Sequence, residues 1–509
     1  MTEKNKLHNL LQSSYLYIGG AILIYMMLML PQYSNYSCNY DFFYYLGRAK
    51  KAIAYPLSIF QPDYALRFHP IYFLFTSLTY RVFGLSTLGH GSLNVITHVL
   101  NSLLLFNLLR QTGLSKAPAT LCLVFFLVLS SQWGVISDIA SLIRLGAALF
   151  FLSAMVSFVA FLKTGKKTFL IYSLMFFIIS FGFNEDAISL PPLLLAMIFL
   201  VAPEKMSVWK RLFYTAPFFV LVFLYILLSA HIGSLQSARL GIGSHVPLRL
   251  LSMIKEFVHA LFIPRPEFVA PLGRVPRIAI RLFPIFLIAL FVFVVLKLRE
   301  RYLTEDSAAF LLDWKILIFA IAWLIITGLP YSTRPTGWVW QNRYLYIPGI
   351  GASIICGTLA WNLWLSLKLL PEGYPKIKRY ILLFALFTTF SYALTLNIAT
   401  SIFMSYKARS EVDAATKEEV PVAFSFVNEL REIYPAFPQN SILVIETLPI
   451  QPERLKKILV TYYGSLPSAI VDAQNRDKLR ILLQSRRENI IYLKWQDNRL
   501  LRMPNQSLS

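Results

Sequence analysis

Long apolar blocks are the feature that most constrains how this chain folds. They run to roughly 17 to 24 residues, the length at which an α-helix crosses a hydrocarbon core about 30 Å thick. Only 15% of the residues are charged and 56% are hydrophobic, whereas roughly a quarter are charged in a typical soluble domain. The chain is therefore predicted to be an α-helical polytopic membrane protein.

The apolar blocks predict about eleven transmembrane helices in a module of residues 1–402. They lie near residues 13–31, 88–109, 117–133, 142–162, 168–184, 187–202, 212–230, 280–297, 314–330, 345–366 and 379–402. The stretch 67–84 is also apolar, but Arg67, His69 and Arg81 interrupt it and it is too short to span. We therefore expect it to form a helix that lies in the membrane interface.

Basic residues in the short loops between the blocks predict how the chain is inserted. The formal net charge of +22 would suggest nucleic-acid binding in a soluble protein. Here, however, Lys and Arg lie in loops such as 163–167 and 368–379, as the positive-inside rule requires of cytoplasmic loops. We therefore expect no nucleic-acid partner and a cytoplasmic amino terminus. The expected location is a bacterial inner membrane, with the active site and carboxy terminus on the periplasmic or extracellular side.

The tail, residues 403–509, turns soluble in composition. Strand-like runs at 441–447 and 489–494 accompany helix-like runs at 423–434 and 452–463. The sequence therefore predicts that a small extracytoplasmic α/β domain follows the membrane module.

Several kinds of site lack their usual signatures in this sequence. No Gly-rich phosphate loop follows a strand and no HExxH motif occurs, so nucleotide-driven transport and metalloproteolysis are not indicated. The three cysteines, Cys38, Cys122 and Cys356, are far apart and support neither a disulfide framework nor a thiolate metal site.

Asp41 is the first candidate for chemistry, in the aromatic segment NYDFFYYLGRAKKA after the first predicted span. Among aromatic side chains a carboxylate can serve as a general base toward a hydroxyl or an amine. The alternative is an ordinary loop acid paired with Arg48 or Lys51, and the spacing alone favours that interpretation.

A polar stripe runs along the second predicted span. His90, Asn94, His98 and Asn101 recur at spacings of four, four and three, which puts them on one helix face. The stripe either lines a wet cavity, with His90 as a site candidate, or joins helices by hydrogen bonds, which suits Asn101. Two histidines eight residues apart need a third ligand to bind one metal. We therefore predict no cofactor, with a divalent cation as the open alternative.

Two groups of charged residues are predicted on the same outer side. Asp138 and Arg144 lie at the start of the fourth span, and Glu185 and Asp186 lie in the hairpin FNEDAISLPP. Ionisable groups at membrane depth are costly, so they mark sites or ion pairs. These residues either pair with one another or hold a charged ligand.

Arg343 lies in QNRYLYIPGIG at the outer mouth of the tenth span, with Arg334 nearby. A guanidinium group binds phosphate through two parallel hydrogen bonds, so Arg343 is a candidate ligand for a lipid phosphate. The alternative is interfacial anchoring together with Tyr344 and Tyr346.

Three stretches together resemble the C-type (GT-C) membrane glycosyltransferases, particularly the protein O-mannosyltransferase-like and TMTC-like group. The run from RFHPIYFLF to HVLNSLLLFNLLR resembles the juxtamembrane helix of that group and its span of His-x3-Asn-x3-His character. FNEDAISLP and QNRYLYIPGIG resemble two further stretches and follow in the family order. The resemblance covers most of residues 36–366 and is confined to the membrane module.

The resemblance implies inverting transfer of a sugar from a polyprenyl-phosphate-linked donor to a protein, lipid or glycan acceptor. It implies that Asp41 is the base. For this mechanism we expect Arg343 to hold the lipid phosphate and Glu185 to orient the acceptor or Arg144. The other expected contacts with donor phosphate or substrate are Arg144, Arg334, Tyr44, His69, His90, Asn94 and Asp138.

Two other functions remain open from the sequence. A transporter or flippase for a lipid-linked glycan would use the same polar residues as a path, and its signature would be repeated halves with paired broken helices. Only one such interruption occurs, near Pro191 and Pro192. An inactive scaffold whose outer domain binds partners is the third alternative.

Overall fold

Helices dominate the structure, a computed structural model of the chain. The residues it describes are 18–30, 40–63, 67–129, 132–136, 138–201, 207–232, 308–332, 342–368, 395, 426–427, 429–434, 441–446, 455, 459, 469–472, 489–496 and 499–502. The chain divides into two compact units. The first comprises Met1–Gln32, Pro62–Phe68 and Gly91–Ser405, and the second comprises Tyr33–Gln61, His69–His90 and Tyr406–Ser509.

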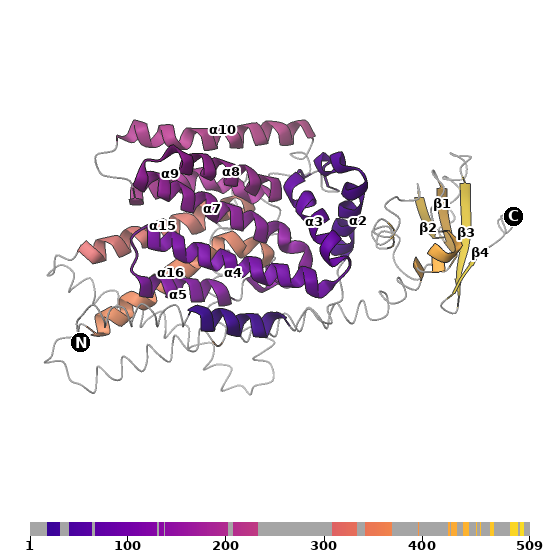
Figure 1. The fold of residues 1–509 in the computed structure, drawn as a ribbon, viewed down its shortest axis with the longest axis horizontal. Coiled ribbons are helices and arrows are strands. Elements are labelled where there is room, and N and C mark those ends of the chain that lie inside the picture. The colour runs from indigo at the N-terminus through magenta and orange to yellow at the C-terminus, as the bar shows by residue number, and fades with distance from the viewer. Residues whose placement is uncertain are drawn as a thin grey trace. The chain divides into compact units, whose positions relative to one another are not determined.

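The first unit is a bundle of long helices that run side by side (Figure 1). Its helices are Ile18–Met29, α4 (Thr87–Gln111, which begins in the second unit), α5 (Lys116–Val128), α6 (Trp133–Ile136), α7 (Leu142–Thr164), α8 (Lys167–Phe183), α9 (Leu190–Val201), α10 (Val208–Ile232), α15 (Ala308–Ser332) and α16 (Tyr346–Lys368). Three short 3-10 turns connect them, namely η4 (Ile139–Ser141), η5 (Glu185–Ser189) and η7 (Asn342–Leu345). α7 packs on α8, and α16 packs on both α5 and α15.

Four helices are long and apolar enough to cross a membrane: Thr87–Gln111, Leu142–Thr164, Trp209–Leu228 and Trp314–Tyr331. Shorter apolar helices occupy further predicted spans. The prediction of a helical, multi-pass membrane protein is therefore confirmed. The predicted spans near 280–297 and 379–402 lie outside the described residues, so the number of eleven stays a prediction.

Small residues let α16 approach its neighbours closely. A Cβ atom on Gly351 would lie 2.8 Å from the Ala320 carbonyl oxygen of α15, and one on Gly357 would collide with Cys122 of α5. Close backbone approach of this kind is the usual way that membrane helices gain packing energy. It places the first turn of α16 deep in the bundle, where Tyr346 is 1% exposed.

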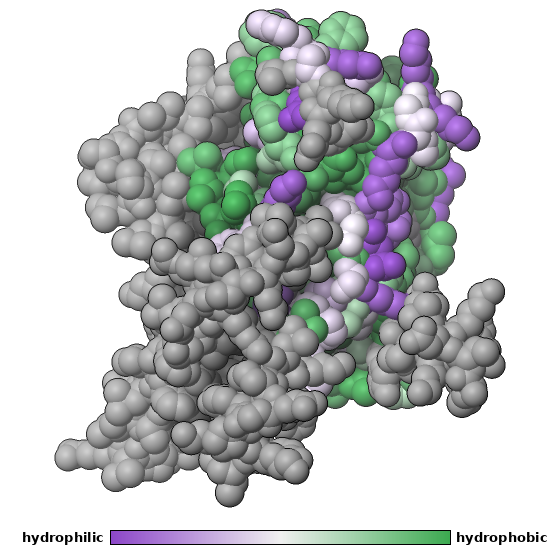
Figure 2. Space-filling model, turned by 90° about the vertical axis from the view of Figure 1, so that its left-hand side faces the viewer, coloured by the Kyte–Doolittle hydropathy of each residue, from purple (hydrophilic) through white to green (hydrophobic). Residues whose placement is uncertain are grey.

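Basic residues mark one end of the bundle. At this end α4 gives way to α5, α7 to α8, and α9 to α10 (Figure 1). Arg110 and Lys116 lie on either side of the first junction, and Lys163 and Lys167 on either side of the second. Hydrophilic side chains form a column on this end of the molecule (Figure 2). The junctions at 110–116 and 163–167, which the sequence predicts on one side of the membrane, thus share one end of the bundle, while 369–379 lies outside the described residues.

In the second unit, α2 (Tyr40–Ala54), η2 (Pro56–Phe60) and α3 (Pro70–Phe83) pack together. Ser77 of α3 donates a hydrogen bond to the Ala49 carbonyl of α2 at 3.3 Å. α3 begins at a proline and ends at Gly84, whose φ of 55° suits glycine. The prediction of a helix too short to span within 67–84 is confirmed, and its place in the interface stays a prediction.

The described part of the tail contains a four-stranded mixed sheet of order β2-β1-β3-β4. The strands are β1 (Ser441–Glu446), β2 (Ala469–Asp472), β3 (Asn489–Gln496) and β4 (Arg499–Arg502). β1 is parallel to both β2 and β3, while β3 and β4 form an antiparallel pair. β1 and β3 occupy the two runs that the sequence predicts as strands.

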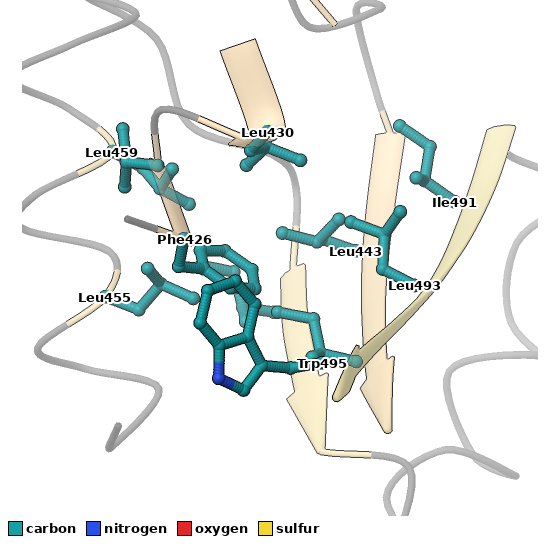
Figure 3. Close-up of a cluster of buried hydrophobic side chains, with 11 residues drawn as sticks. Phe426, Leu430, Leu443, Leu455, Leu459, Ile491, Leu493 and Trp495 are labelled. Carbon is teal, nitrogen blue, oxygen red and sulfur yellow. The ribbon is translucent and has the colours of Figure 1, made fainter. Parts of the chain in front are cut away.

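One face of this sheet carries a hydrophobic core (Figure 3). Leu443, Leu493 and Trp495 extend from the strands toward the helical residues Phe426 and Leu430. The alternate residues of β1 are buried as well, as expected of a central parallel strand with an uninterrupted apolar sequence.

Ile445→Val is expected to destabilise the tail domain by about 1 kcal/mol, because the lost methyl group leaves a small void in this core. In the full-length protein, hydrogen exchange of the β1 amides should be about fivefold faster. Leu501→Ala, on the exposed side chain of β4, is the control and should change stability by less than about 0.5 kcal/mol. Equal effects of the two substitutions would contradict the assignment of Ile445 to the core.

Candidate functional site

An ion pair lies buried where α7 begins and the α8–α9 hairpin turns. Arg144, in the first turn of α7, is 7% exposed and donates from Nη1 to Oδ2 of Asp186 at 3.2 Å. Asn184 donates from Nδ2 to the same oxygen at 2.9 Å. The negative charge of the neighbouring Glu185 also acts on Arg144. The sequence left open whether these charges pair or hold a ligand, and the structure shows that Arg144 pairs with Asp186.

Local sequence explains why the acidic residues lie in a tight turn. α8 ends at Phe183, and Asn184 then adopts an extended conformation before η5. Pro191 and Pro192 follow in the first turn of α9, where proline is tolerated because the first amide groups have no helical acceptor. The turn η5 therefore presents its carboxylates at the end of the bundle where α7 begins.

An aromatic ring from a distant part of the sequence covers the other side of Arg144. The guanidinium carbon Cζ lies 4.4 Å from the ring centroid of Tyr344, in η7. The Tyr344 ring in turn lies 5.2 Å from that of Tyr331, near the end of α15. A cation over an aromatic face gains electrostatic energy, and the gain is larger where water is excluded. Arg144 is thus held between a carboxylate and a ring.

Asp138 and Asn94 hold the segment before α7 against α4. Asp138 caps η4: its Oδ1 accepts from the Ala140 amide at 3.1 Å and its Oδ2 accepts from the Ser141 hydroxyl at 2.8 Å. Asn94 donates from Nδ2 to the Asp138 carbonyl at 2.9 Å and to the Ile136 carbonyl at 3.3 Å. Both side chains therefore have structural partners at positions where the sequence predicts substrate contacts.

The inner half of the polar stripe on α4 joins helices. His98 and Asn101 both contact the hydroxyl of Tyr346, at 2.7 Å and 3.0 Å. Asn101 also donates to the Leu145 carbonyl of α7 at 3.1 Å. The alternative of hydrogen bonding between helices is therefore confirmed for Asn101. Interfacial anchoring is wrong for Tyr344 and Tyr346, because both are buried inside the bundle.

The candidates of the second unit lie on α2, α3 and the first turn of α4. Asp41 and Tyr44 are in α2, and His69 is the buried N-cap residue of α3. His90 Nε2 lies 3.1 Å from the Gly84 carbonyl, which links the start of α4 to the end of α3. Arg48, offered as a partner for Asp41, donates to the Gln61 and Ser58 carbonyls at 2.7 Å and 3.3 Å. The side chain of Asp41 is not among the described parts of α2.

Two arginine candidates are only partly placed. Arg343 lies in η7, directly before Tyr344, and its backbone alone is described. Arg334 lies outside the described residues. No three His, Cys, Asp or Glu side chains come together as a metal-binding group in the part of the chain that the structure describes.

Two residues of this region, Tyr346 and Gln132, were not among the predicted site residues. Asp186, which the sequence named beside Glu185 without giving it a role of its own, is the ion-pair partner of Arg144. Tyr346 and Gln132 are buried, and Gln132 donates from Nε2 to the Tyr346 carbonyl at 3.4 Å. A signal for Tyr346 was present, since buried His and Asn side chains on α4 require polar partners.

No protein-family model and no curated protein matches the sequence. The fold of this chain does resemble those of solved structures. The oligosaccharyltransferase AglB from Archaeoglobus fulgidus, in complex with an inhibitory peptide and a dolichol-phosphate, matches with a TM-score of 0.52 at 11% identity, over 94% of this chain and 69% of that one. Its complex with Zn and sulfate matches with a TM-score of 0.50 at 12% identity, over 94% of this chain and 67% of that one.

A second protein, ArnT from Cupriavidus metallidurans bound to undecaprenyl phosphate, matches with a TM-score of 0.44 at 11% identity, over 96% of each chain. The chain spans 64% of the AglB chain that is tethered to an acceptor peptide. AglB and ArnT are GT-C membrane glycosyltransferases. The fold of the chain is therefore similar to that of AglB, a GT-C membrane glycosyltransferase, and the resemblance predicted from the sequence is confirmed at the level of fold.

Proposed function

We propose that this protein transfers a sugar from a polyprenyl-phosphate-linked donor to an acceptor on the non-cytoplasmic face of the membrane. The observation that carries the proposal is the fold, which over 94% of the chain resembles that of an oligosaccharyltransferase solved with a dolichol-phosphate. The buried Arg144, braced by Asp186 and Tyr344, supports it further. A charge held at this depth in a membrane protein is typical of a functional site.

Arg343 is the proposed ligand of the donor phosphate. It lies in η7 next to Tyr344, whose ring covers Arg144, so both arginines belong to the same region of the first unit. A guanidinium group has five N–H donors, and the structure shows one hydrogen bond from Arg144 to Asp186. We assign it a supporting role: it adds positive charge near the leaving phosphate. Preorganised charge of this kind stabilises a leaving group that gains negative charge.

Asp41 is the proposed general base. The acceptor hydroxyl or amine attacks the anomeric carbon and gives its proton to the Asp41 carboxylate. The bond between that carbon and the phosphate oxygen breaks, and the polyprenyl phosphate leaves with the electron pair. Attack from the side opposite the leaving group inverts the anomeric centre. Glu185 orients the acceptor, since its neighbour Asp186 already binds Arg144.

The remaining candidates fall into two groups. The side chains of Asn94, Asp138 and His90 contact backbone groups in the structure, so we assign them a structural role around the site. Tyr44 and His69 keep their proposed role as substrate contacts, and Arg334 keeps its role near the phosphate. The tail, residues 403–509, is proposed as a separate domain on the non-cytoplasmic face that controls access of the acceptor, and the membrane as a bacterial inner membrane.

A divalent cation stays the open alternative as a cofactor. One AglB structure contains Zn and sulfate, so a divalent cation is compatible with the fold. The described residues of this chain, however, supply no group of three ligand side chains.

Arg343→Lys is expected to weaken binding of a polyprenyl phosphate about tenfold, because lysine keeps the charge but loses the planar pair of hydrogen bonds. Equilibrium binding of undecaprenyl phosphate to protein in detergent micelles measures the effect. Arg211→Lys, at the opposite, basic end of the bundle, is the matched control and should leave affinity unchanged. Equal affinity of both variants would remove Arg343 from the phosphate site.

A further inference from the structure

The hydroxyl of Tyr346 is the centre of a buried polar cluster inside the helix bundle. His98 Nδ1 lies 2.7 Å from it and Asn101 Nδ2 lies 3.0 Å from it. His98 and Asn101 are fully buried, and Tyr346 is the first residue of α16. We call these three residues the Tyr346 cluster.

The direction of each hydrogen bond in the cluster follows from elementary chemistry. His98 Nε2 lies 3.2 Å from the Leu127 carbonyl, which can only accept, so Nε2 carries the ring proton. Nδ1 of the neutral ring is then an acceptor and receives the proton of the Tyr346 hydroxyl. The Tyr346 oxygen in turn accepts from the amide of Asn101. The cluster therefore has a single ordered arrangement.

Both partners of the arginine–tyrosine contact are attached to this cluster. Asn101 donates its other amide hydrogen to the Leu145 carbonyl, one residue after Arg144. Tyr346 follows Tyr344 by two residues, across the junction between η7 and α16. The cluster thus connects the backbone beside Arg144 to the backbone that carries Tyr344.

The start of α16 is also fixed through its own backbone. Gln132 donates to the Tyr346 carbonyl at 3.4 Å, and Trp323 Nε1 donates to the Ile347 carbonyl at 2.9 Å. These carbonyls lie in the first turn of α16, so side-chain donors from α15 and from the residue before α6 orient that turn. The Tyr346 hydroxyl adds an indirect connection to α7, the helix that carries Arg144, because it accepts from Asn101 of α4 and Asn101 also donates to the Leu145 carbonyl.

We infer that His98, Asn101 and Tyr346 are positioning residues that hold Tyr344 against Arg144 and thereby set the affinity of the site for the lipid-phosphate donor. The inference rests on the proposed function and deepens it. It differs from simple joining of helices, which other hydroxyls in the bundle provide. Ser173 of α8, for example, donates to the Ala154 carbonyl of α7 at 2.8 Å, remote in sequence from η7 and α16.

Tyr346→Phe removes the hydroxyl and keeps the ring, so it tests the cluster with little change of shape. We expect the KM for a polyprenyl-phosphate sugar to rise about tenfold, below the 10²-fold that a displacement of about 1 Å can cost. The kcat should stay within about twofold, as expected when binding common to ground and transition state is lost. Ser173→Ala is the matched control: it also loses one bond between helices, and its KM should match that of the parent protein.

Hydrogen exchange at the amides of residues 342–347 provides a readout that is independent of activity. It should be faster in Tyr346→Phe than in Ser173→Ala. If Tyr346→Phe fails to fold, Asn101→Leu takes its place and should also exchange faster than Ser173→Ala. A rise in KM with faster exchange supports the inference. Unchanged KM, or exchange equal to that of Ser173→Ala, overturns it. If the parent protein transfers no sugar, the proposed function fails, and the exchange comparison alone decides whether the cluster positions η7.

Discussion

Asp41→Asn is expected to lower the rate of sugar transfer by about 10² to 10⁴, the range typical of a lost general base. Asparagine keeps the shape of the side chain but cannot take the proton from the acceptor. Donor affinity should stay close to that of the parent protein, because the phosphate is held by other residues. Single-turnover transfer and equilibrium binding of the donor, measured on the same preparation, separate the two effects.

Glu185→Gln is the comparison variant, since Glu185 is the other carboxylate proposed to act in the reaction. It should weaken use of the acceptor and retain more turnover than Asp41→Asn. Near-normal turnover in Asp41→Asn, with loss of turnover in Glu185→Gln, would transfer the role of base to Glu185.

Asp186→Leu is expected to lower the free energy of unfolding by about 3 to 5 kcal/mol, because it leaves the charge of Arg144 buried without its carboxylate. Replacing both partners, as in Arg144→Met with Asp186→Leu, should recover most of that loss, since no uncompensated charge then remains. Equilibrium unfolding of the single and double variants in bicelles measures both quantities.

The double variant also separates stability from function. It should be folded, yet bind polyprenyl phosphate more weakly than the parent, because Arg144 contributes charge to the site. A loss below about 1 kcal/mol in Asp186→Leu would mean that Glu185, the adjacent acid, compensates Arg144 instead.

The positions of most helices could be predicted from the sequence because apolar length is a local property. Where a predicted helix boundary differs from the observed one, the cause is local as well. The span predicted at 187–202 begins at Leu190 because Pro191 and Pro192 belong in a first helical turn, with η5 before them. The strands β1 and β3 could also be predicted from local sequence, since each is a run of apolar and β-branched residues.

The partners within the site could not be predicted in the same way. Charge alternation along the chain indicated that the start of α7 and the α8–α9 hairpin share one side, and their ion pair agrees with this. Which acid meets Arg144 depends on the shape of η5, so the sequence named both Glu185 and Asp186 as possible partners without choosing between them. Tyr344 lies 200 residues beyond Arg144 in the sequence, so no spacing rule connects them.

The two tyrosines of η7 and α16 show why the alternative of interfacial anchoring does not fit this chain. Tyrosine at the end of a span usually anchors a helix at the membrane surface. Here Gly351 and Gly357 bring α16 close to α15 and α5, and Tyr346 at its first turn contacts His98 of α4. Burial of the ring therefore depends on packing between helices that are far apart in the sequence.

Product formation by the purified protein in liposomes measures the proposed function most directly. The protein is supplied with a panel of polyprenyl-phosphate sugars and with protein, lipid and glycan acceptors. We expect glycosylated acceptor and free polyprenyl phosphate to appear in equal amounts, and both to fall together in Asp41→Asn. Movement of the lipid-linked sugar across the liposome membrane, with no glycosylated acceptor from any donor, would contradict the proposed transfer and favour a transporter.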